Sequence, residues 1–148
     1  MPRRVPVHFS TWVGPAATIC LCAEGVLAVV QSFASRASRI LGGSIIVTSS
    51  TVAVTKVPTI AHYAAAKEAA VSLVKTAALE LGGRGIRVNA VLPGNIYTKG
   101  RAKAIKAMGE IGLEVDRWAE ATQPVGRSGT PEEAGQVVLF LASEAASF

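Results

Sequence analysis

Apolar residues recur at helical spacing in two long segments of the chain. Residues 16–41 carry an apolar stripe and are predicted to form a long helix, which the glycine pair 42–43 ends. Residues 60–81 are rich in alanine and predict a second long helix, with a left-handed cap at the glycine pair 82–83. The stripe of the first helix consists of Val26, Leu27, Val29, Val30 and Phe33. Both helices therefore need a partner surface for their apolar sides.

Two short runs of apolar and β-branched residues are typical of strands. Residues 44–49 and 86–92 have the composition of strands that are buried on both faces of a parallel sheet. A loop at 51–59 and the helix at 60–81 connect them, and Pro93-Gly94 ends the second strand. Strand, helix and strand in this order form a βαβ unit, whose parallel strands need helices on both faces. We therefore expect an α/β fold with a doubly wound parallel sheet flanked by long helices.

The C-terminal third has a weaker pattern. Residues 95–128 are charged and poorly periodic, which predicts short helices around a mobile loop. A last helix is expected from Pro131 to about Ala142, with Thr130 as its N-cap and acidic residues in its first turn. No repeat or linker divides residues 1–148, so we expect one domain or part of one.

Composition narrows the classes of function. The chain has 148 residues, of which 50% are hydrophobic, so it can bury a core. A net charge of +5 and a pI near 9.6 make nucleic-acid binding an alternative. The main basic cluster consists of Lys99, Arg101, Lys103 and Lys106. A solvated face explains so small a cluster better than nucleic acid does. Cys20 and Cys22 lie too close together for a disulfide framework, and they fit a reducing compartment such as the cytoplasm.

The N-terminal segment resembles a secretory signal in part. Arg3 and Arg4 precede a mostly apolar run at 11–23. The apolar character continues beyond any cleavage site, and Glu24 interrupts it before the roughly 18 residues that a membrane span requires. We therefore expect a soluble protein without a membrane partner.

Tyr63 and Lys67 are the first candidates for chemistry. In a helix, residues four apart rise from the same face, so the phenol and the ammonium would be neighbours. A nearby cation favours the phenolate, as does the positive end of a helix dipole, and the pair can then act as a general acid/base. The same spacing also arises by chance, so by itself it leaves a plain helix as an equal alternative.

The neighbouring segments favour the chemical interpretation. Ser50 stands thirteen residues before Tyr63, at the end of the first strand, and Pro93-Gly94 stands at the corresponding end of the next strand. Open α/β sheets bind their ligands at the carboxyl ends of the strands. These residues are therefore expected to converge on one site.

Four motifs in this order resemble the C-terminal half of the short-chain dehydrogenase/reductase (SDR) family, including its 3-oxoacyl-acyl-carrier-protein reductases. They are GGSIIVTSS, YAAAK, GIRVNAVLPGNIYT and PVGRSGTPEEAGQVVLFLASEAASF. The resemblance covers roughly residues 22–148, and residues 1–21 match poorly. It implies a partial Rossmann-like domain and an oxidoreductase that uses NAD or NADP on a secondary alcohol or ketone.

The resemblance also implies roles for single residues. Tyr63 would exchange a proton with the substrate oxygen, and Ser50 would hydrogen-bond that oxygen. Lys67 would favour the phenolate and hold the nicotinamide ribose, so that Tyr63 and Lys67 also contact the cofactor. The segment lining the nicotinamide would comprise Pro93, Gly94, Ile96 and Thr98. No metal is implied.

The chain departs from the family pattern in three respects. The glycine-rich turn that binds the pyrophosphate has no match, and the last strand of the family's sheet has none either. We therefore expect a truncated domain that lacks the dinucleotide-binding half and the last strand, with weak or no NAD(P) binding. Cys22 stands where many members carry an asparagine, and a thiol replaces an amide poorly. A short edge strand at 5–9 is one possible replacement for missing strands.

Two functions remain open at this stage. The first is an SDR oxidoreductase, and the second is a non-catalytic relative that serves as a binding or assembly partner. In either case the helices at 16–41 and 60–81 resemble those through which family members pair, so a homo-oligomer is expected. NAD and NADP are not distinguished.

Overall fold

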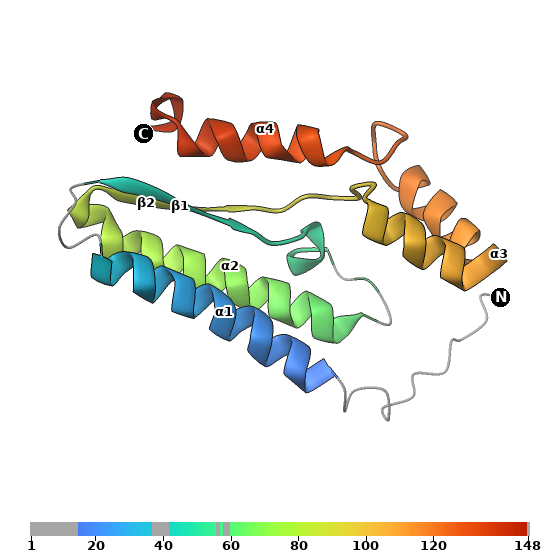
Figure 1. Ribbon diagram of the computed structural model, residues 1–148, viewed down its shortest axis with the longest axis horizontal. Helices are drawn as coiled ribbons and strands as arrows, with labels where there is room; N and C mark the ends of the chain where they lie inside the picture. Colours follow the sequence, from blue (N-terminus) through green and yellow to red (C-terminus); the bar gives the residue numbers. More distant parts are fainter. Residues whose placement is uncertain (1–14, 37–41, 56, 58–59, 148) are drawn as a thin grey trace. The chain divides into compact units, whose positions relative to one another are not determined.

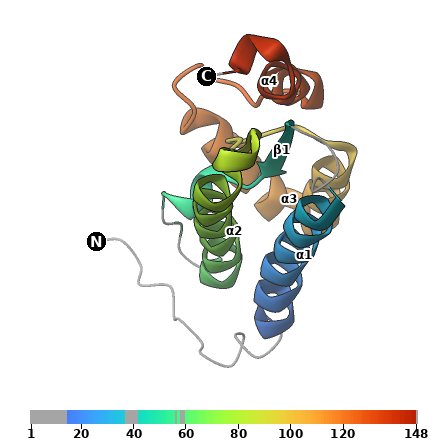
Figure 2. The same cartoon turned by 90° about the vertical axis from the view of Figure 1, so that its left-hand side faces the viewer.

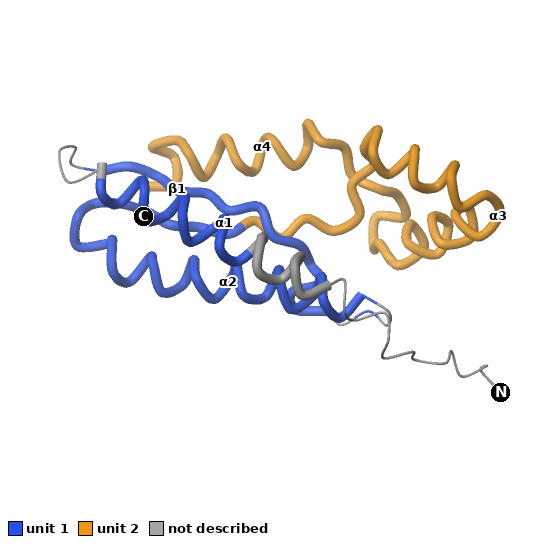
Figure 3. Tube along the Cα trace, turned by 60° about the horizontal axis from the view of Figure 1, so that its bottom comes forward, with its two compact units in different colours: residues 1–90 blue, residues 91–148 orange. Residues whose placement is uncertain are grey.

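The computed structural model describes residues 15–36, 42–55, 57 and 60–147 (Figure 1). Residues 1–90 and 91–148 form two compact units (Figure 3). The predicted edge strand at 5–9 lies outside the described residues, as do the last five positions of the helix predicted at 16–41.

The first unit contains the predicted βαβ arrangement. Its strands pair in the order β1-β2 as a parallel two-stranded sheet. The helices α1 and α2 pack against each other and lie side by side along one face of this sheet (Figures 1 and 2). The elements are α1 (Pro15–Arg36), β1 (Gly43–Thr48), the 3-10 turn η3 (Thr51–Ala53), α2 (Ala61–Leu81), the 3-10 turn η4 (Gly82–Arg84) and β2 (Ile86–Val91).

The core of this unit lies between the two helices and the sheet. Alternate residues of each strand face the helices, as the two-residue period of a strand requires. On the other side of β1, Ile46 stays partly exposed, so the prediction of a strand buried on both faces is met on the helix side only. The buried core residues are Val30, Ile45, Val74, Ala77, Leu81, Ile86 and Val88.

The apolar stripe predicted for α1 divides between two sides of the helix. Val26 and Val30 pack in the core together with Ala34, each one turn from the next. The other three stripe residues are exposed, with Leu27 at 40%, Val29 at 62% and Phe33 at 36%. Val29 and Phe33, one turn apart, therefore form a second apolar surface that this unit does not cover, whereas Leu27 lies on another side of the helix.

The left-handed cap of α2 lies later than predicted. Gly82 has a right-handed backbone (φ −58°, ψ −41°), and the chain continues through η4 before it reverses at Gly85 (φ 71°). The prediction of a left-handed cap at residues 82–83 is therefore wrong. At Gly85 the positive φ favours glycine, whereas a Cβ atom there would make only an ordinary contact with the Gly42 Cα at 3.4 Å.

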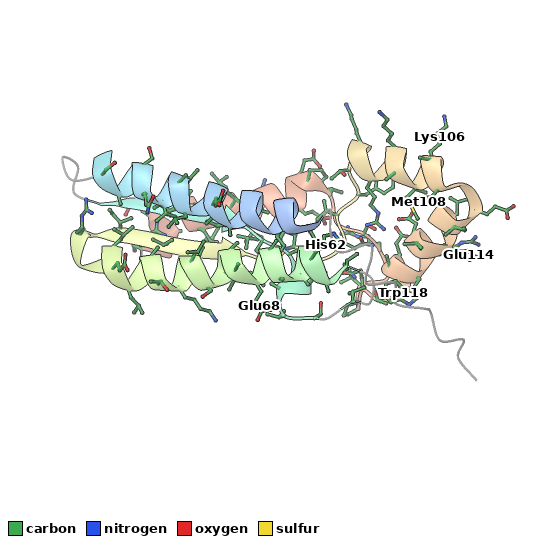
Figure 4. All side chains as sticks on the ribbon, turned by 90° about the horizontal axis from the view of Figure 1, so that it is seen from below. His62, Glu68, Lys106, Met108, Glu114 and Trp118 are labelled. Atoms are coloured by element: carbon green, nitrogen blue, oxygen red, sulfur yellow. The ribbon has the colours of Figure 1, made fainter. Side chains whose placement is uncertain are left out.

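The second unit contains more helix than its weak periodicity indicated. Residues 99–121 form α3 (Lys99–Ala121), in which two shorter helical arms meet at the non-helical Gly109 (φ 61°, ψ −136°), so the predicted short helices are present. The two arms of α3 approach closely, because a Cβ atom on the buried Gly112 would lie 2.3 Å from the Ile105 carbonyl oxygen. Lys106 extends from the first arm, and Trp118 belongs to the second (Figure 4).

The last helix, α4 (Pro131–Ala142), begins as predicted. The Thr130 hydroxyl accepts a hydrogen bond from the Glu133 amide (3.2 Å), and the Glu133 carboxylate accepts one from the Thr130 amide (2.8 Å). Arg127 donates to both oxygens of that carboxylate, at 2.9 and 2.6 Å. These bonds, first the one from Arg127 and then the one from Thr130, lower the pKa of Glu133 from its ordinary 4.5 to about 2.

The lowered pKa predicts how acid affects the start of α4. The Glu133 carboxylate contributes stability at pH values above about 4.5, and this contribution is lost as the pH falls toward 2. Urea unfolding followed by circular dichroism should show a lower free energy of unfolding for Glu133→Gln than for wild type at neutral pH. This difference should shrink as the pH falls from about 4.5 toward 2. Glu132→Gln, which leaves the capping box intact, is the matched control. A difference in the free energy of unfolding that stays constant from neutral pH to pH 2 would contradict the lowered pKa of Glu133.

Candidate active site

Tyr63 and Lys67 lie together on α2, as their spacing predicts. Tyr63 is in the first turn and Lys67 one turn later, and both side chains are partly buried. The Lys67 Nζ lies 5.6 Å from the centroid of the Tyr63 ring. At this distance an ammonium interacts favourably with the face of an aromatic ring.

A second contact holds the lysine side chain. The Lys67 Nζ donates a hydrogen bond to the Thr48 carbonyl oxygen at 3.3 Å. Thr48 is the last residue of β1, so the ammonium lies at the carboxyl end of this strand, where open α/β sheets bind ligands. The strand end and the helix thus meet at the lysine.

Ser50 belongs to the same strand end. It caps η3, and its Oγ accepts a weak hydrogen bond from the Val52 amide at 3.4 Å. A hydroxyl that accepts in this way keeps its own hydrogen for donation. Because η3 contacts α2, and because Thr48 two residues earlier binds Lys67, the structure brings Ser50 into the neighbourhood of the tyrosine–lysine pair.

The second group of predicted residues lies on the segment that follows β2, in the second unit. Ile96 pairs with Gly129 in a parallel bridge, in which the Tyr97 amide donates to the Gly129 carbonyl and the Gly129 amide donates to the Asn95 carbonyl, each at 2.8 Å. Such a bridge leaves the amide and carbonyl of Ile96 itself pointing to the opposite side. The backbone of Ile96 is therefore placed to bind a group other than this partner strand.

The remaining residues of this segment have structural roles as well. The Thr98 hydroxyl caps α3 by accepting from the Arg101 amide (3.1 Å), a role that the sequence analysis missed. Pro93 follows β2 and ends its pairing, since proline has no amide hydrogen. Gly94 allows a close approach, because a Cβ atom there would lie 2.7 Å from the Gln123 side-chain oxygen.

A buried polar cluster that the sequence analysis did not identify holds this segment. Arg101 donates to the Asn95 side-chain oxygen and pairs with Asp116 on the second arm of α3. Both side chains of the ion pair are largely buried, at 18% and 19% exposure. Arg101 therefore does not share the solvated face that was predicted for the basic cluster, whereas Lys99, Lys103 and Lys106 are exposed.

One donor of this cluster has no partner. The Asn95 Nδ2 atom is buried and finds no hydrogen-bond acceptor among the described residues. A buried amide donor without a partner costs about 1–3 kcal/mol, so the position suits an acceptor supplied by a ligand or by water.

The described residues give no support to a role for Cys22, to a metal site or to a membrane span. The backbone of Cys22 lies in α1, but its side chain is outside the described residues. Within the described segments, no group of three potential metal-ligating side chains is found. In the same segments no helix has the length and hydropathy of a membrane span.

The comparisons with known proteins show the family of the chain. A family model described as enoyl-(acyl carrier protein) reductase matches residues 4–148. The chain belongs to the SDR family. The family prediction and the partial Rossmann-like fold are thereby confirmed, and SDR proteins of this kind are oxidoreductases.

Several SDR relatives show the extent of the similarity. The chain is 40% identical over 125 residues to the 3-oxoacyl-acyl-carrier-protein reductase FabG of Thermotoga maritima, covering 84% of this chain and 48% of that protein. It is 39% identical over 106 residues to 2-(S)-hydroxypropyl-CoM dehydrogenase 3 of Xanthobacter autotrophicus, covering 72% and 41%. The chain thus spans less than half the length of these curated relatives.

Two solved SDR structures resemble the chain. The crystal structure of NAD+-bound xylitol dehydrogenase matches with a TM-score of 0.81 at 26% identity, covering 90% of this chain and 55% of that one. A short-chain dehydrogenase family protein of Francisella tularensis matches with a TM-score of 0.65 at 29% identity, over 73% and 46%. Both support the SDR fold.

The Arg101 cluster yields a stability prediction. Arg101→Ala leaves the Asp116 carboxylate and the Asn95 amide without their partner, which should cost about 1–3 kcal/mol. Lys103→Ala, on the same arm of α3 but exposed, should leave the stability nearly unchanged. Urea unfolding followed through Trp118 fluorescence, in a Trp12→Phe background, measures both. Equal stability of the two variants would show that the cluster does not hold the segment.

Proposed function

We propose that this SDR chain carries the proton-transfer site of an NAD(P)-dependent oxidoreductase that acts on a secondary alcohol or ketone. The observation that carries the proposal is the position of the Lys67 ammonium, which is held by the Thr48 carbonyl and lies 5.6 Å from the Tyr63 ring. An acid/base phenol needs a fixed cation beside it, and this geometry supplies one.

The roles of the residues follow from their chemistry. In alcohol oxidation, the Tyr63 phenolate accepts the hydroxyl proton of the substrate, and in ketone reduction the phenol returns it. Ser50 donates its hydroxyl hydrogen to the same substrate oxygen and stabilises the negative charge that develops there. The role that we propose for Lys67 is to place a positive charge beside the Tyr63 ring. Transfer of the hydride to or from the substrate carbon would be the chemistry that a nicotinamide cofactor supplies when bound.

The segment after β2 has groups that fit the nicotinamide carboxamide. That group has both donors and acceptors, and the outward-facing backbone of Ile96 offers one of each. The Thr98 hydroxyl keeps its hydrogen while it caps α3, and the Asn95 Nδ2 donor lacks a partner among the described residues. Pro93 and Gly94 complete the lining segment that we propose.

Tyr63→Phe tests the catalytic role, because only the hydroxyl is removed and the ring stays. We expect turnover with NADH or NADPH in large excess to fall by about 10²–10⁴ fold over a panel of ketones and secondary alcohols. Tyr97→Phe, which changes the only other tyrosine, is the matched control and should retain activity. The measurement is the absorbance of the reduced nicotinamide, with circular dichroism to check the helix. Unchanged turnover of Tyr63→Phe would remove this residue from the mechanism.

A second candidate function is supported by the outer surface of α1. The exposed side chains of Val29 and Phe33, one turn apart, form an apolar surface and line an open hollow together with Ala28 and Ser32. Exposed apolar surfaces of this kind mark interaction sites. We propose that copies of the chain pair through α1 and α2, with or without catalysis.

Val29→Glu tests the assembly proposal. A charge placed in this surface should shift the chain toward monomer, because burying an unpaired carboxylate in an interface is unfavourable. Gln31→Glu adds the same charge to another exposed side of α1 and should leave the assembly unchanged. Sedimentation velocity at several protein concentrations measures the result. Identical sedimentation of wild type and Val29→Glu would exclude pairing through this surface.

A further inference from the structure

A buried serine stands beside the proposed catalytic serine and binds the helix instead of the substrate. Ser49 is only 5% exposed, and its hydroxyl donates a hydrogen bond of 2.8 Å to the backbone carbonyl of Lys67. The two residues are 18 positions apart in the chain, so the bond joins the end of β1 to the middle of α2.

This bond and the lysine contact form a reciprocal pair. The side chain of Ser49 binds the backbone of Lys67, while the side chain of Lys67 binds the backbone of Thr48, the residue before Ser49. Two bonds in opposite directions between the same two segments restrict both sliding and rotation of α2 against the strand end, because each is directional.

We propose that Ser49 is a positioning residue, whose hydrogen bond fixes the position of Lys67 in the site. This proposal rests on the proposed function. Tyr63 and Lys67 are carried by α2, whereas Ser50 is carried by the end of β1. The Ser49 hydroxyl joins the two halves without contacting a substrate. A misplacement of about 1 Å in such a site is enough to reduce catalysis strongly.

The alternative is that Ser49 only satisfies its own buried hydroxyl. In that case Ser49→Ala removes the hydroxyl and with it the requirement for a hydrogen-bond acceptor. The Lys67 ammonium then keeps its contact with the Thr48 carbonyl. If Ser49 positions the lysine, the same substitution frees the ammonium. The chemical reactivity of Lys67 separates the two cases, and it can be measured without turnover.

The experiment compares the acetylation rates of lysines in the folded full-length chain. Wild type, Ser49→Ala and Ser128→Ala are treated with N-hydroxysuccinimidyl acetate, and the rate at Lys67 is divided by the rate at Lys75, an exposed lysine on the same helix. Ser128 is the matched control, since it is a buried serine (9% exposed) that donates to Glu120 at 3.2 Å. Mass spectrometry of the peptides gives the ratio, and circular dichroism confirms that each variant is folded.

We expect Ser49→Ala to raise the ratio roughly three- to tenfold, as the loss of one hydrogen bond implies, and Ser128→Ala to leave it unchanged. Ser49→Thr, which retains the hydroxyl, should restore the wild-type ratio. An unchanged ratio in folded Ser49→Ala, or an equal rise in Ser128→Ala, would overturn the proposal. A loss of turnover in Tyr63→Phe tests the proposed function separately, so that either idea can fail alone.

Discussion

The contact between the carboxyl end of β1 and α2 is the constraint on which the candidate site depends. A phenol, an ammonium and a hydroxyl can share one substrate only if the strand and the helix that carry them are held at a fixed distance. The structure supplies hydrogen bonds across this contact at 2.8 and 3.3 Å, both of which involve Lys67. The lysine is therefore a structural link as well as a candidate for chemistry.

Hydrogen bonds of this kind contribute only about 1 kcal/mol each, so they cannot hold two elements together by themselves. The apolar core of the first unit does so, through side chains such as Val74, Ile86 and Val88 that lie between α2 and the sheet. Burial of one such side chain contributes about 1.5–3 kcal/mol. The core thus brings the elements together, and the directional bonds then select one arrangement of them.

Charged and polar side chains hold the segment after β2 in the second unit, whereas apolar packing holds the elements of the first unit together. Arg101 connects the segment after β2 to the second arm of α3 through Asn95 and Asp116, and the kink at Gly109 allows the arms to approach. A guanidinium suits this task because its several donors lie in one plane and can bind two partners at once. We propose that the backbone around Ile96 contacts the cofactor. It is held by main-chain pairing with Gly129 and by the Arg101 cluster.

The local pattern of the sequence determined much of this protein. Helical and strand spacing located α2, β1, β2 and the start of α1 to within a few residues, and Thr130 was identified as the cap of α4. The family and the partial Rossmann-like fold followed from four motifs, and the pairing of Tyr63 with Lys67 followed from their separation. These features depend on residues that are close in the chain, whose geometry is set by helix and strand periods alone.

Only the tertiary structure decided which polar groups meet across elements. The bond from Ser49 to Lys67 spans 18 positions and the pair of Arg101 with Asp116 spans 15, and no spacing rule predicts either. The position of the reversal at Gly85 instead of residues 82–83 likewise became evident only in the structure, where the 3-10 turn η4 continues α2. The physical reason is that periodicity is a property of one element, whereas the partner of a buried polar group depends on how several elements pack together.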